Sequence, residues 1–219
     1  RMNYIILGPT GYIGEAFSNY CRLHEIPHRL VSRSDVAYDR VDKEFSEWLA
    51  AFSGTHDGAV TVINCAGYIG KPNVDACEDN KEATLYGNVV LPQYLSSLCE
   101  SLKIKYAHIS SGCIYSGSAD FNENQRPNFS FDSGGSFYSG SKALAERVVS
   151  KNPTAWQFRL RIPFDNVASP RNYITKLLTY EQLVDVENSI SHRGDYVDAC
   201  MKLMRRQAPY GIYNVANVG

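Results

Sequence analysis

Three residues near the middle of the chain have the types and spacing needed to pass a proton to a carbonyl oxygen. Ser111 follows an apolar run, residues 106–109, that predicts a buried strand, and Tyr138 and Lys142 stand four positions apart in a helical pattern. Side chains at i and i+4 share one face of a helix. We therefore expect the Lys142 ammonium to lower the pKa of the Tyr138 phenol from about 10 towards neutral. The Ser111 hydroxyl would hold the carbonyl oxygen while Tyr138 gives or takes its proton.

The Tyr-x-x-x-Lys spacing is weak evidence when it stands alone, because both residues are common in helices. An aromatic side chain on a core face and a lysine in solvent give the same pattern. Its interpretation depends on the elements that surround it.

A strand, a glycine-rich turn and a helix near the N-terminus form an arrangement that binds the diphosphate of a dinucleotide. Residues 3–7 are an apolar run suited to a buried parallel strand, and Gly8, Gly11 and Gly14 follow it before a helical stretch. Gly8 permits a tight turn, Gly11 lets phosphates approach the backbone, and Gly14 lets helix and strand pack closely. The helix N-terminus presents free N–H groups to the phosphates. The other cofactor contacts expected in this turn are Thr10, Tyr12 and Ile13.

The end of the second predicted strand, residues 28–31, bears on the choice of cofactor. An NAD site usually has an acidic residue here for the ribose 2′-hydroxyl, but this chain has Ser32 and Arg33. Arg33 can pair with a 2′-phosphate, which favours NADP(H). Asp35 lies close enough to leave NAD(H) open, and a solvated loop arginine is the alternative interpretation of Arg33.

Two further segments are expected beside the cofactor. A third apolar strand, residues 59–63, ends where ligands of open α/β sheets bind. A long helix, residues 81 to about 102, contains Asn88 and is expected to kink at Pro92. The cofactor contacts predicted after the third strand are Cys65, Ala66 and Gly67.

Strands alternate with helices along almost the whole chain, so we expect an α/β fold with a doubly wound parallel sheet, the Rossmann fold. The remaining predicted elements are helices at residues 45–52, 141–150, 172–180 and 195–206 and strands at residues 156–162 and 212–215.

Length and composition exclude several classes of function. A chain of 219 residues fits one α/β domain, or one domain and part of another. The net charge of −1 supplies no basic surface for nucleic acid, and no apolar run is long enough to cross a membrane. The six cysteines lack C-x-x-C spacing, so we predict no metal site and reduced thiols in a cytoplasmic protein.

Four motifs in order make the chain resemble the extended short-chain dehydrogenase/reductases, the NAD-dependent epimerase/dehydratase superfamily. They are GxxGxxG at 8–14, Asn-Cys-Ala-Gly at 64–67, Ser-Gly-Cys-Ile-Tyr at 111–115 and Tyr-x-x-x-Lys at 138–142. Segments 70–78, 135–142 and 169–176 make it most similar to dTDP-4-dehydrorhamnose reductases and to the bifunctional 3,5-epimerase/4-reductases that form nucleotide-rhamnose. The resemblance covers essentially the whole chain.

The resemblance implies roles for individual residues. Ser111 and Tyr138 would bind the 4-keto oxygen of a UDP- or dTDP-linked sugar, and Tyr138 would protonate it. Lys142 would lower the pKa of Tyr138 and, with Tyr138, contact the nicotinamide ribose, while Asn88 would support the site beside the cofactor. The substrate contacts implied are Asn73, Ser111, Gly112, Cys113, Arg171 and Asn172.

The same resemblance implies a second activity for Cys113 and Lys176. Carbons 3 and 5 of the sugar flank a ketone, so their protons are acidic, and a thiol poised by an ammonium can remove and return them. Simple 4-reductases need no such cysteine. Together the two residues favour a bifunctional enzyme, although Cys113 as a small core residue and Lys176 as a surface lysine are the alternatives.

The resemblance also predicts how the chain is organised. Residues 2–165 would form the NAD(P)-binding domain, and residues 166–219 a small, incomplete substrate-binding part intertwined with the last Rossmann elements. Family members continue for several dozen residues after the strand at 212–215. A homodimer is expected, with helices 81–102 and 138–150 packed in a four-helix bundle.

Two other functions stay open at this point. A monofunctional 4-reductase or epimerase would leave Cys113 in the core or Lys176 far from the substrate. An NADP-binding regulatory subunit, similar to that of methionine adenosyltransferase, would bind the cofactor without turnover. The intact Ser111, Tyr138 and Lys142 argue against this second alternative.

Overall fold

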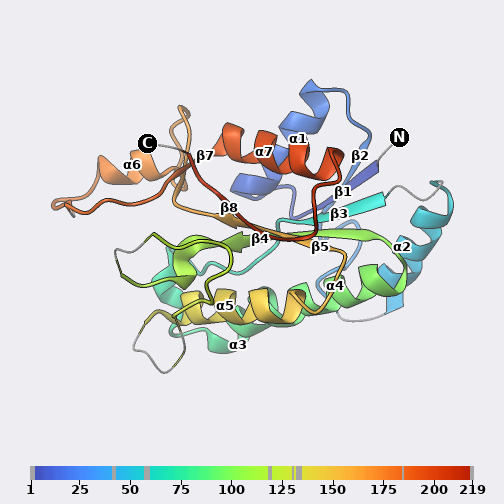
Figure 1. Cartoon of the computed structure of the whole chain (residues 1–219), viewed down its shortest axis with the longest axis horizontal. Helices are drawn as coiled ribbons and strands as arrows, with labels where there is room; N and C mark the ends of the chain where they lie inside the picture. The colour runs from blue at the N-terminus through green and yellow to red at the C-terminus, as the bar shows by residue number, and fades with distance from the viewer. Residues whose placement is uncertain are drawn as a thin grey trace.

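Six parallel strands form the central sheet in the order β2-β1-β3-β4-β5-β8 (Figure 1). This computed structural model describes residues 3–40, 43–56, 60–117, 120–129, 131, 135–183 and 185–217. The strands are β1 (Asn3–Leu7), β2 (His28–Val31), β3 (Val60–Asn64), β4 (Lys105–Ser111), β5 (Ala155–Leu160) and β8 (Gly211–Val215). The chain moves outward from β1 to β2 and returns to the other side of β1 with β3, so a ligand site is expected at the carboxyl ends of β1 and β3.

Helices cover both faces of this sheet, as the prediction of a doubly wound α/β fold requires. Helices α1 (Tyr12–Leu23) and α7 (Arg193–Arg205) lie on one face, and α2 (Lys43–Gly54), α4 (Leu91–Ser101) and α5 (Phe137–Val149) on the other (Figure 1). A hydrophobic core lies between the sheet and the helices on each face, with Phe17 buried in the first core and Phe45 in the second. Because β1 and β3 are covered on both sides, they are mostly apolar, whereas β4 and β5 also bury the polar side chains of His108, Gln157 and Arg159. The predicted fold class is confirmed.

The helical segment around Asn88 differs from the single kinked helix that we predicted. Helix α3 (Lys81–Leu85) continues into a π-helical turn, Tyr86–Val90, before α4 begins. Pro92 lacks an N–H group, and its ring would clash with the carbonyl four residues earlier, that of Asn88. The wider π turn accommodates this proline and places Asn88 inside the irregular segment, a type of turn often found at functional sites.

The elements outside the main sheet are short. Strands β6 (Pro163–Phe164) and β7 (Ser191–His192) form a separate parallel pair, which the sequence did not predict because two residues show no periodicity. The helix predicted over 172–180 is limited to α6 (Tyr173–Leu177). The strand predicted over 156–162 ends at Leu160, where the chain turns. Residue 59 of the predicted third strand lies outside the described residues.

The N-terminus of α5 is the boundary that matters most for the site. We predicted that Tyr138 opens a helical pattern completed by residues 141–150; α5 begins at Phe137, so Tyr138 lies in its first turn. The Ser136 hydroxyl caps this end by accepting the Ser139 N–H at 3.1 Å. The Glu78 carboxylate accepts the Phe137 N–H at 2.6 Å and ties the 70–78 segment to the same end. None of the helices formed by the described residues has the length and apolar composition needed to span a membrane.

Candidate active site

The backbone packing of the glycine turn requires glycine at positions 8 and 14, whereas position 11 has room for a side chain. Gly8 has a φ of +71°, and a Cβ added to it would stand 3.0 Å from the Ala66 backbone nitrogen. A Cβ on Gly14 would stand 2.1 Å from the Gly8 carbonyl oxygen. A Cβ on Gly11 would make only an ordinary 3.4 Å contact with that oxygen. The space beside Gly11 is therefore available to a ligand, as a dinucleotide diphosphate requires.

Arg171 lies over the same turn. Its Nη1 atom is 3.9 Å from the position that a Gly11 Cβ would occupy. The resemblance assigned Arg171 to the substrate, but the structure places its guanidinium on the side where the cofactor phosphates are expected. An arginine there supplies charge-assisted hydrogen bonds to a diphosphate.

The other turn residues occupy the start of α1. Thr10 is exposed, while Tyr12 and Ile13 are half-buried. The Arg193 guanidinium lies 4.2 Å from the centroid of the Tyr12 ring and forms an ion pair with Asp165 at 2.9 Å. This contact fixes the N-terminus of α1 against the loop after β6.

The end of β2 brings Ser32 and Arg33 to the surface beside the turn. The Ser32 hydroxyl and N–H donate to the Asp35 carboxylate at 2.7 and 3.0 Å, and these hydrogen bonds lower the pKa of Asp35. Arg33 is 72% exposed, and its ion pair with Asp39 is long, at 3.6 Å. The Asp35 carboxylate is thus engaged in hydrogen bonds with Ser32, while the exposed Arg33 guanidinium can contact a phosphate group.

The loop after β3 is held in place by two buried asparagines. The Asn64 Oδ1 accepts the Ala66 N–H at 3.0 Å and fixes the backbone of Cys65, Ala66 and Gly67 at the carboxyl edge of the sheet. The Asn88 Oδ1 accepts the Tyr68 N–H at 2.8 Å.

Asn88 also connects this loop to α5. Its amide nitrogen donates to the Tyr68 carbonyl at 2.9 Å and to the Ser141 hydroxyl at 3.0 Å. Both N–H groups of the amide are thus used within the protein. Asn88 thus links the loop after β3 to α5, and its place among the residues around the cofactor stays a prediction.

Ser111, Cys113 and Tyr138 share one site at the carboxyl end of β4. The Ser111 Oγ accepts the Cys113 N–H at 3.1 Å, which begins the short 3₁₀ turn Gly112–Ile114. A hydrogen bond from Ser111 lowers the pKa of Tyr138, but burial raises it more, so the phenol has a pKa above its usual value. Cys113 is near enough to Tyr138 and Lys142 to affect their pKa values, and Lys142 reaches the same strand through the Ile109 carbonyl.

Lys142 is buried on α5 beneath this site. Its Nζ donates to the Ile109 carbonyl at 3.1 Å, and burial lowers its pKa to about 8. The structure does not show the lowering of the Tyr138 pKa by Lys142 that we expected. The physical reason is that the ammonium is turned to the Ile109 carbonyl while the phenol is desolvated.

The cation that contacts Cys113 is Arg161, which we did not predict. The Nη1 of Arg161 lies 2.9 Å from the Cys113 Sγ. Lys176, predicted for this role, is half-exposed on α6, and no hydrogen bond between described residues joins it to Cys113. Leu160 pairs with Ser111 in the sheet, so Arg161, the next residue, comes close to the turn that follows β4.

Two predicted substrate contacts have structural roles. The buried Asn172 accepts the Ile174 N–H at 3.0 Å, capping α6, and its amide nitrogen donates to the carbonyls of Asp165 and Val167. This satisfied amide does not support a substrate contact. Asn73 is exposed and caps a 3₁₀ turn by accepting the Asp75 N–H at 2.9 Å. The hydrogen bond between the Glu78 carboxylate and the Phe137 N–H holds the 70–78 segment, and with it Asn73, near the start of α5.

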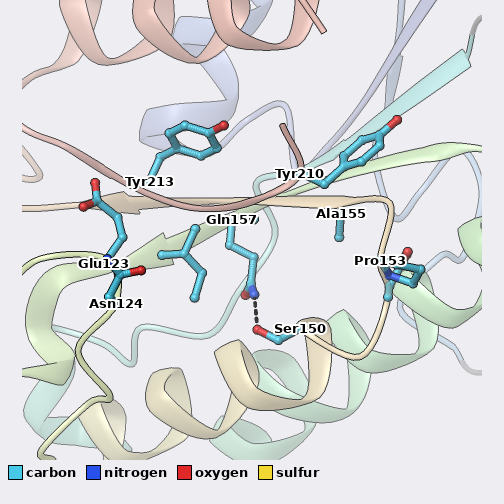
Figure 2. Close-up of a pocket in the computed structure, with 11 residues that line it drawn as sticks. Glu123, Asn124, Ser150, Pro153, Ala155, Gln157, Tyr210 and Tyr213 are labelled. Atoms are coloured by element: carbon cyan, nitrogen blue, oxygen red, sulfur yellow. Dashed lines mark hydrogen bonds between the residues drawn. The ribbon is translucent and has the colours of Figure 1, made fainter. Parts of the chain in front are cut away.

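A separate cavity of about 550 Å³ lies away from these residues (Figure 2). Its wall includes Ala155 and Gly211, the first residues of β5 and β8, and Gln157, which donates to the Ser150 hydroxyl. Ser111 stands at the opposite, carboxyl end of the sheet, where it pairs with Leu160. The cavity is therefore distinct from the candidate site.

The described residues include no group of three or more His, Cys, Asp or Glu side chains placed to hold a metal.

Comparisons with known proteins agree with this geometry. A bifunctional dTDP-4-dehydrorhamnose 3,5-epimerase/dTDP-4-dehydrorhamnose reductase of Arabidopsis thaliana is 31% identical over 231 residues, covering 99% of this chain and 70% of the plant protein. The chain spans 32% of each of three trifunctional rhamnose-forming enzymes of the same plant.

Solved structures share the fold. The crystal structure of the L780 UDP-rhamnose synthase of Acanthamoeba polyphaga mimivirus has a TM-score of 0.84 at 22% identity, covering 100% of this chain and 76% of the viral one. A dTDP-4-dehydrorhamnose reductase of Bacillus anthracis, in complex with NADP, has a TM-score of 0.80 at 17% identity, covering 100% and 75%. A model of the NAD dependent epimerase/dehydratase family matches residues 4–180. This chain therefore belongs to the NAD dependent epimerase/dehydratase family.

Proposed function

We propose that this protein acts on a UDP- or dTDP-linked 4-keto-6-deoxyhexose, epimerises carbons 3 and 5, and reduces the 4-keto group to give a nucleotide-rhamnose or a related deoxysugar. The observation that carries the proposal is the meeting of Cys113 with Ser111, Tyr138 and Lys142 at the carboxyl end of β4, beside a glycine turn open to a dinucleotide. The activities for which the plant and viral relatives are named support it.

The site residues have distinct tasks in reduction. When bound at the glycine turn, the nicotinamide cofactor supplies a hydride to the carbonyl carbon. Ser111 donates a hydrogen bond to the keto oxygen and aligns it with Tyr138. Because burial raises the pKa of Tyr138, the phenol keeps its proton until the oxygen gains negative charge, and then delivers it. Lys142, with a pKa of about 8, is mostly protonated at neutral pH and offers its charge to the nicotinamide ribose.

Epimerisation uses Cys113 as the base. The thiolate takes the proton from carbon 3 or 5, so that a C–H bond breaks and an S–H bond forms. The electron pair moves towards the keto oxygen, where Ser111 and Tyr138 hold the enolate. A second acid gives a proton to the opposite face of the carbon. Exchange with solvent water then removes the proton from the thiol and returns one to the acid, which restores the starting state. We propose Lys176 as that acid, on the basis of the resemblance.

We propose NADP(H) as the preferred cofactor. The glycine turn, the backbone of residues 65–67 and the Arg171 guanidinium would surround the diphosphate. The exposed Arg33 is placed to receive a 2′-phosphate, and Asp35, the residue that would favour NAD(H), is engaged by Ser32.

Replacing Arg33 should therefore separate the two cofactors. Arg33→Ala is expected to raise the Kd for NADPH about 10- to 100-fold, the worth of a charge-assisted hydrogen bond, and to change the Kd for NADH less than about twofold. Nucleotide fluorescence titration measures both constants. Arg22→Ala, at the far end of α1, is the matched control. Equal losses for both cofactors would show that Arg33 does not read the 2′-phosphate.

The function is tested by incubating the protein with UDP- and dTDP-4-keto-6-deoxyglucose and NADPH, and identifying the products by proton NMR. A rhamnose product is expected. Reduction of a pre-epimerised sugar alone would mean a plain reductase, and cofactor binding without any turnover would favour the regulatory subunit.

The assembly and location are also proposals. Tyr86 and Val90 are 39% and 40% exposed and one turn apart beside α5, which supports a homodimer through this face. Sedimentation velocity should give a dimer for the wild-type protein and a monomer for Val90→Glu.

We propose that residues 2–165 bind the cofactor and that residues 166–219 contribute to the sugar pocket. The six free cysteines support a cytoplasmic location.

A further inference from the structure

We infer that Arg161 is a positioning residue for Cys113: its guanidinium holds the sulfur in place and stabilises negative charge on it, so that Cys113 can act as the base of epimerisation. The inference deepens the proposed function and rests on it for the identity of the reaction. Arg161 thereby supplies a permanent positive charge beside Cys113, although neither the motifs nor the resemblance had pointed to this residue.

The guanidinium is held from two sides. Its Nη1 lies 2.9 Å from the Cys113 Sγ, and its Nε donates to the Asn188 Oδ1 at 3.1 Å. The Arg161 backbone N–H donates to the Ser191 hydroxyl at 3.1 Å, and that hydroxyl donates to the Val215 carbonyl at 2.7 Å. The arginine is therefore anchored to β7 and to the end of β8 while it faces the thiol.

The backbone near both residues is shaped to allow this contact. A Cβ on Gly112 would stand 3.2 Å from the Arg161 Cδ, so the aliphatic part of the arginine packs against the turn that carries Cys113. Ile162, directly after Arg161, has a φ of +39°, an unusual value for a β-branched residue. Strained backbone of this kind persists where the surrounding structure holds it.

Arg161 differs from the two lysines that could assist Cys113. A guanidinium stays protonated at every pH at which the protein is folded, whereas Lys142 has a pKa of about 8 and is hydrogen-bonded to the Ile109 carbonyl. Between the described side chains of Lys176 and Cys113 there is no hydrogen bond. A guanidinium beside a sulfur favours the thiolate, which is the reactive form of cysteine.

The reactivity of Cys113 towards iodoacetamide can be measured without substrate or cofactor. The other five thiols should react slowly at neutral pH, because burial raises the pKa of Cys21 to about 11 and raises those of the remaining four. Those four are Cys65, Cys77, Cys99 and Cys200. Peptide mapping by mass spectrometry on the whole protein then gives the alkylation rate of Cys113 alone.

Three variants separate charge from packing. Arg161→Gln is expected to lower the alkylation rate at neutral pH about tenfold or more, and Arg161→Lys to keep it within about threefold. Lys202→Gln, which removes an exposed cation on α7, is the matched control and should leave the rate within about twofold. Wild-type alkylation in a folded Arg161→Gln protein would overturn the inference. So would a loss that Arg161→Lys fails to restore, or an equal loss in the Lys202→Gln control.

The outcome is independent of the proposed function. If the alkylation pattern is as expected but no deoxysugar is turned over, the arginine–cysteine pair stands and the substrate assignment fails. If the sugar is epimerised while Arg161→Gln alkylates at the wild-type rate, the function stands and Arg161 is only a packing residue.

Discussion

Tyr138→Phe should lower kcat for 4-keto reduction about 100- to 10,000-fold, the usual contribution of a positioned general acid. The reason is that the keto oxygen loses its proton donor, while Ser111 can still hold it. The Kd for NADPH should change less than about tenfold, because the phenylalanine ring keeps the packing of the first turn of α5 and at most one hydrogen bond to the nicotinamide ribose is lost. Stopped-flow reduction of a pre-epimerised 4-keto sugar measures the rate.

Tyr115→Phe is the matched control for this change. The Tyr115 hydroxyl donates to the Gln125 carbonyl at 2.5 Å, within the loop that follows Cys113. Its loss should leave kcat within about threefold of the wild-type value. A Tyr138→Phe protein that reduces the sugar at nearly the wild-type rate would remove Tyr138 from the mechanism.

Glu146→Leu is expected to reduce the free energy of unfolding by about 3–5 kcal/mol. Glu146 accepts two hydrogen bonds from Arg159, at 2.9 and 2.6 Å, and both side chains are almost fully buried. The Ser110 hydroxyl also donates to Glu146, at 3.3 Å. Removing the carboxylate leaves a buried guanidinium without its counter-charge. Urea unfolding at constant m value measures the loss.

Two further variants show that the effect comes from the unpaired charge. The double variant Glu146→Leu/Arg159→Met should recover most of the stability, since an apolar pair can replace a buried ion pair at little cost. Lys202→Ala, which breaks an exposed pair with Asp198, should cost less than about 1 kcal/mol. A loss of that small size for Glu146→Leu would mean that the buried pair does not hold α5 against β4 and β5.

Features encoded by neighbouring residues could be predicted from the sequence. The run at 3–7 forms β1 with the predicted bounds, because a strand covered on both faces needs continuous apolar residues. Gly8 and Gly14 are required by contacts within one strand, turn and helix, so their spacing is visible in the sequence. The same holds for Tyr138 and Lys142, which one helix carries.

Features that depend on contacts between residues far apart in the sequence could not be predicted from the sequence. Arg161 reaches Cys113 across 48 positions only because β5 lies beside β4. Asn88 and Asn172 have amides that suit a ligand equally well, and only the folded chain shows that protein groups already satisfy them. The effect of Lys142 on Tyr138 was overestimated, since burial of the phenol is a property of the whole site.

The central claim is that one site epimerises through Cys113 and reduces through Tyr138. The most direct test is proton NMR of UDP-4-keto-6-deoxyglucose in deuterated water with the protein and without NADPH. We predict deuterium at carbons 3 and 5 with the wild-type protein, and none with Cys113→Ala, which should still reduce a pre-epimerised sugar. Exchange at the wild-type rate in Cys113→Ala, or no exchange in the wild-type protein, would contradict the account.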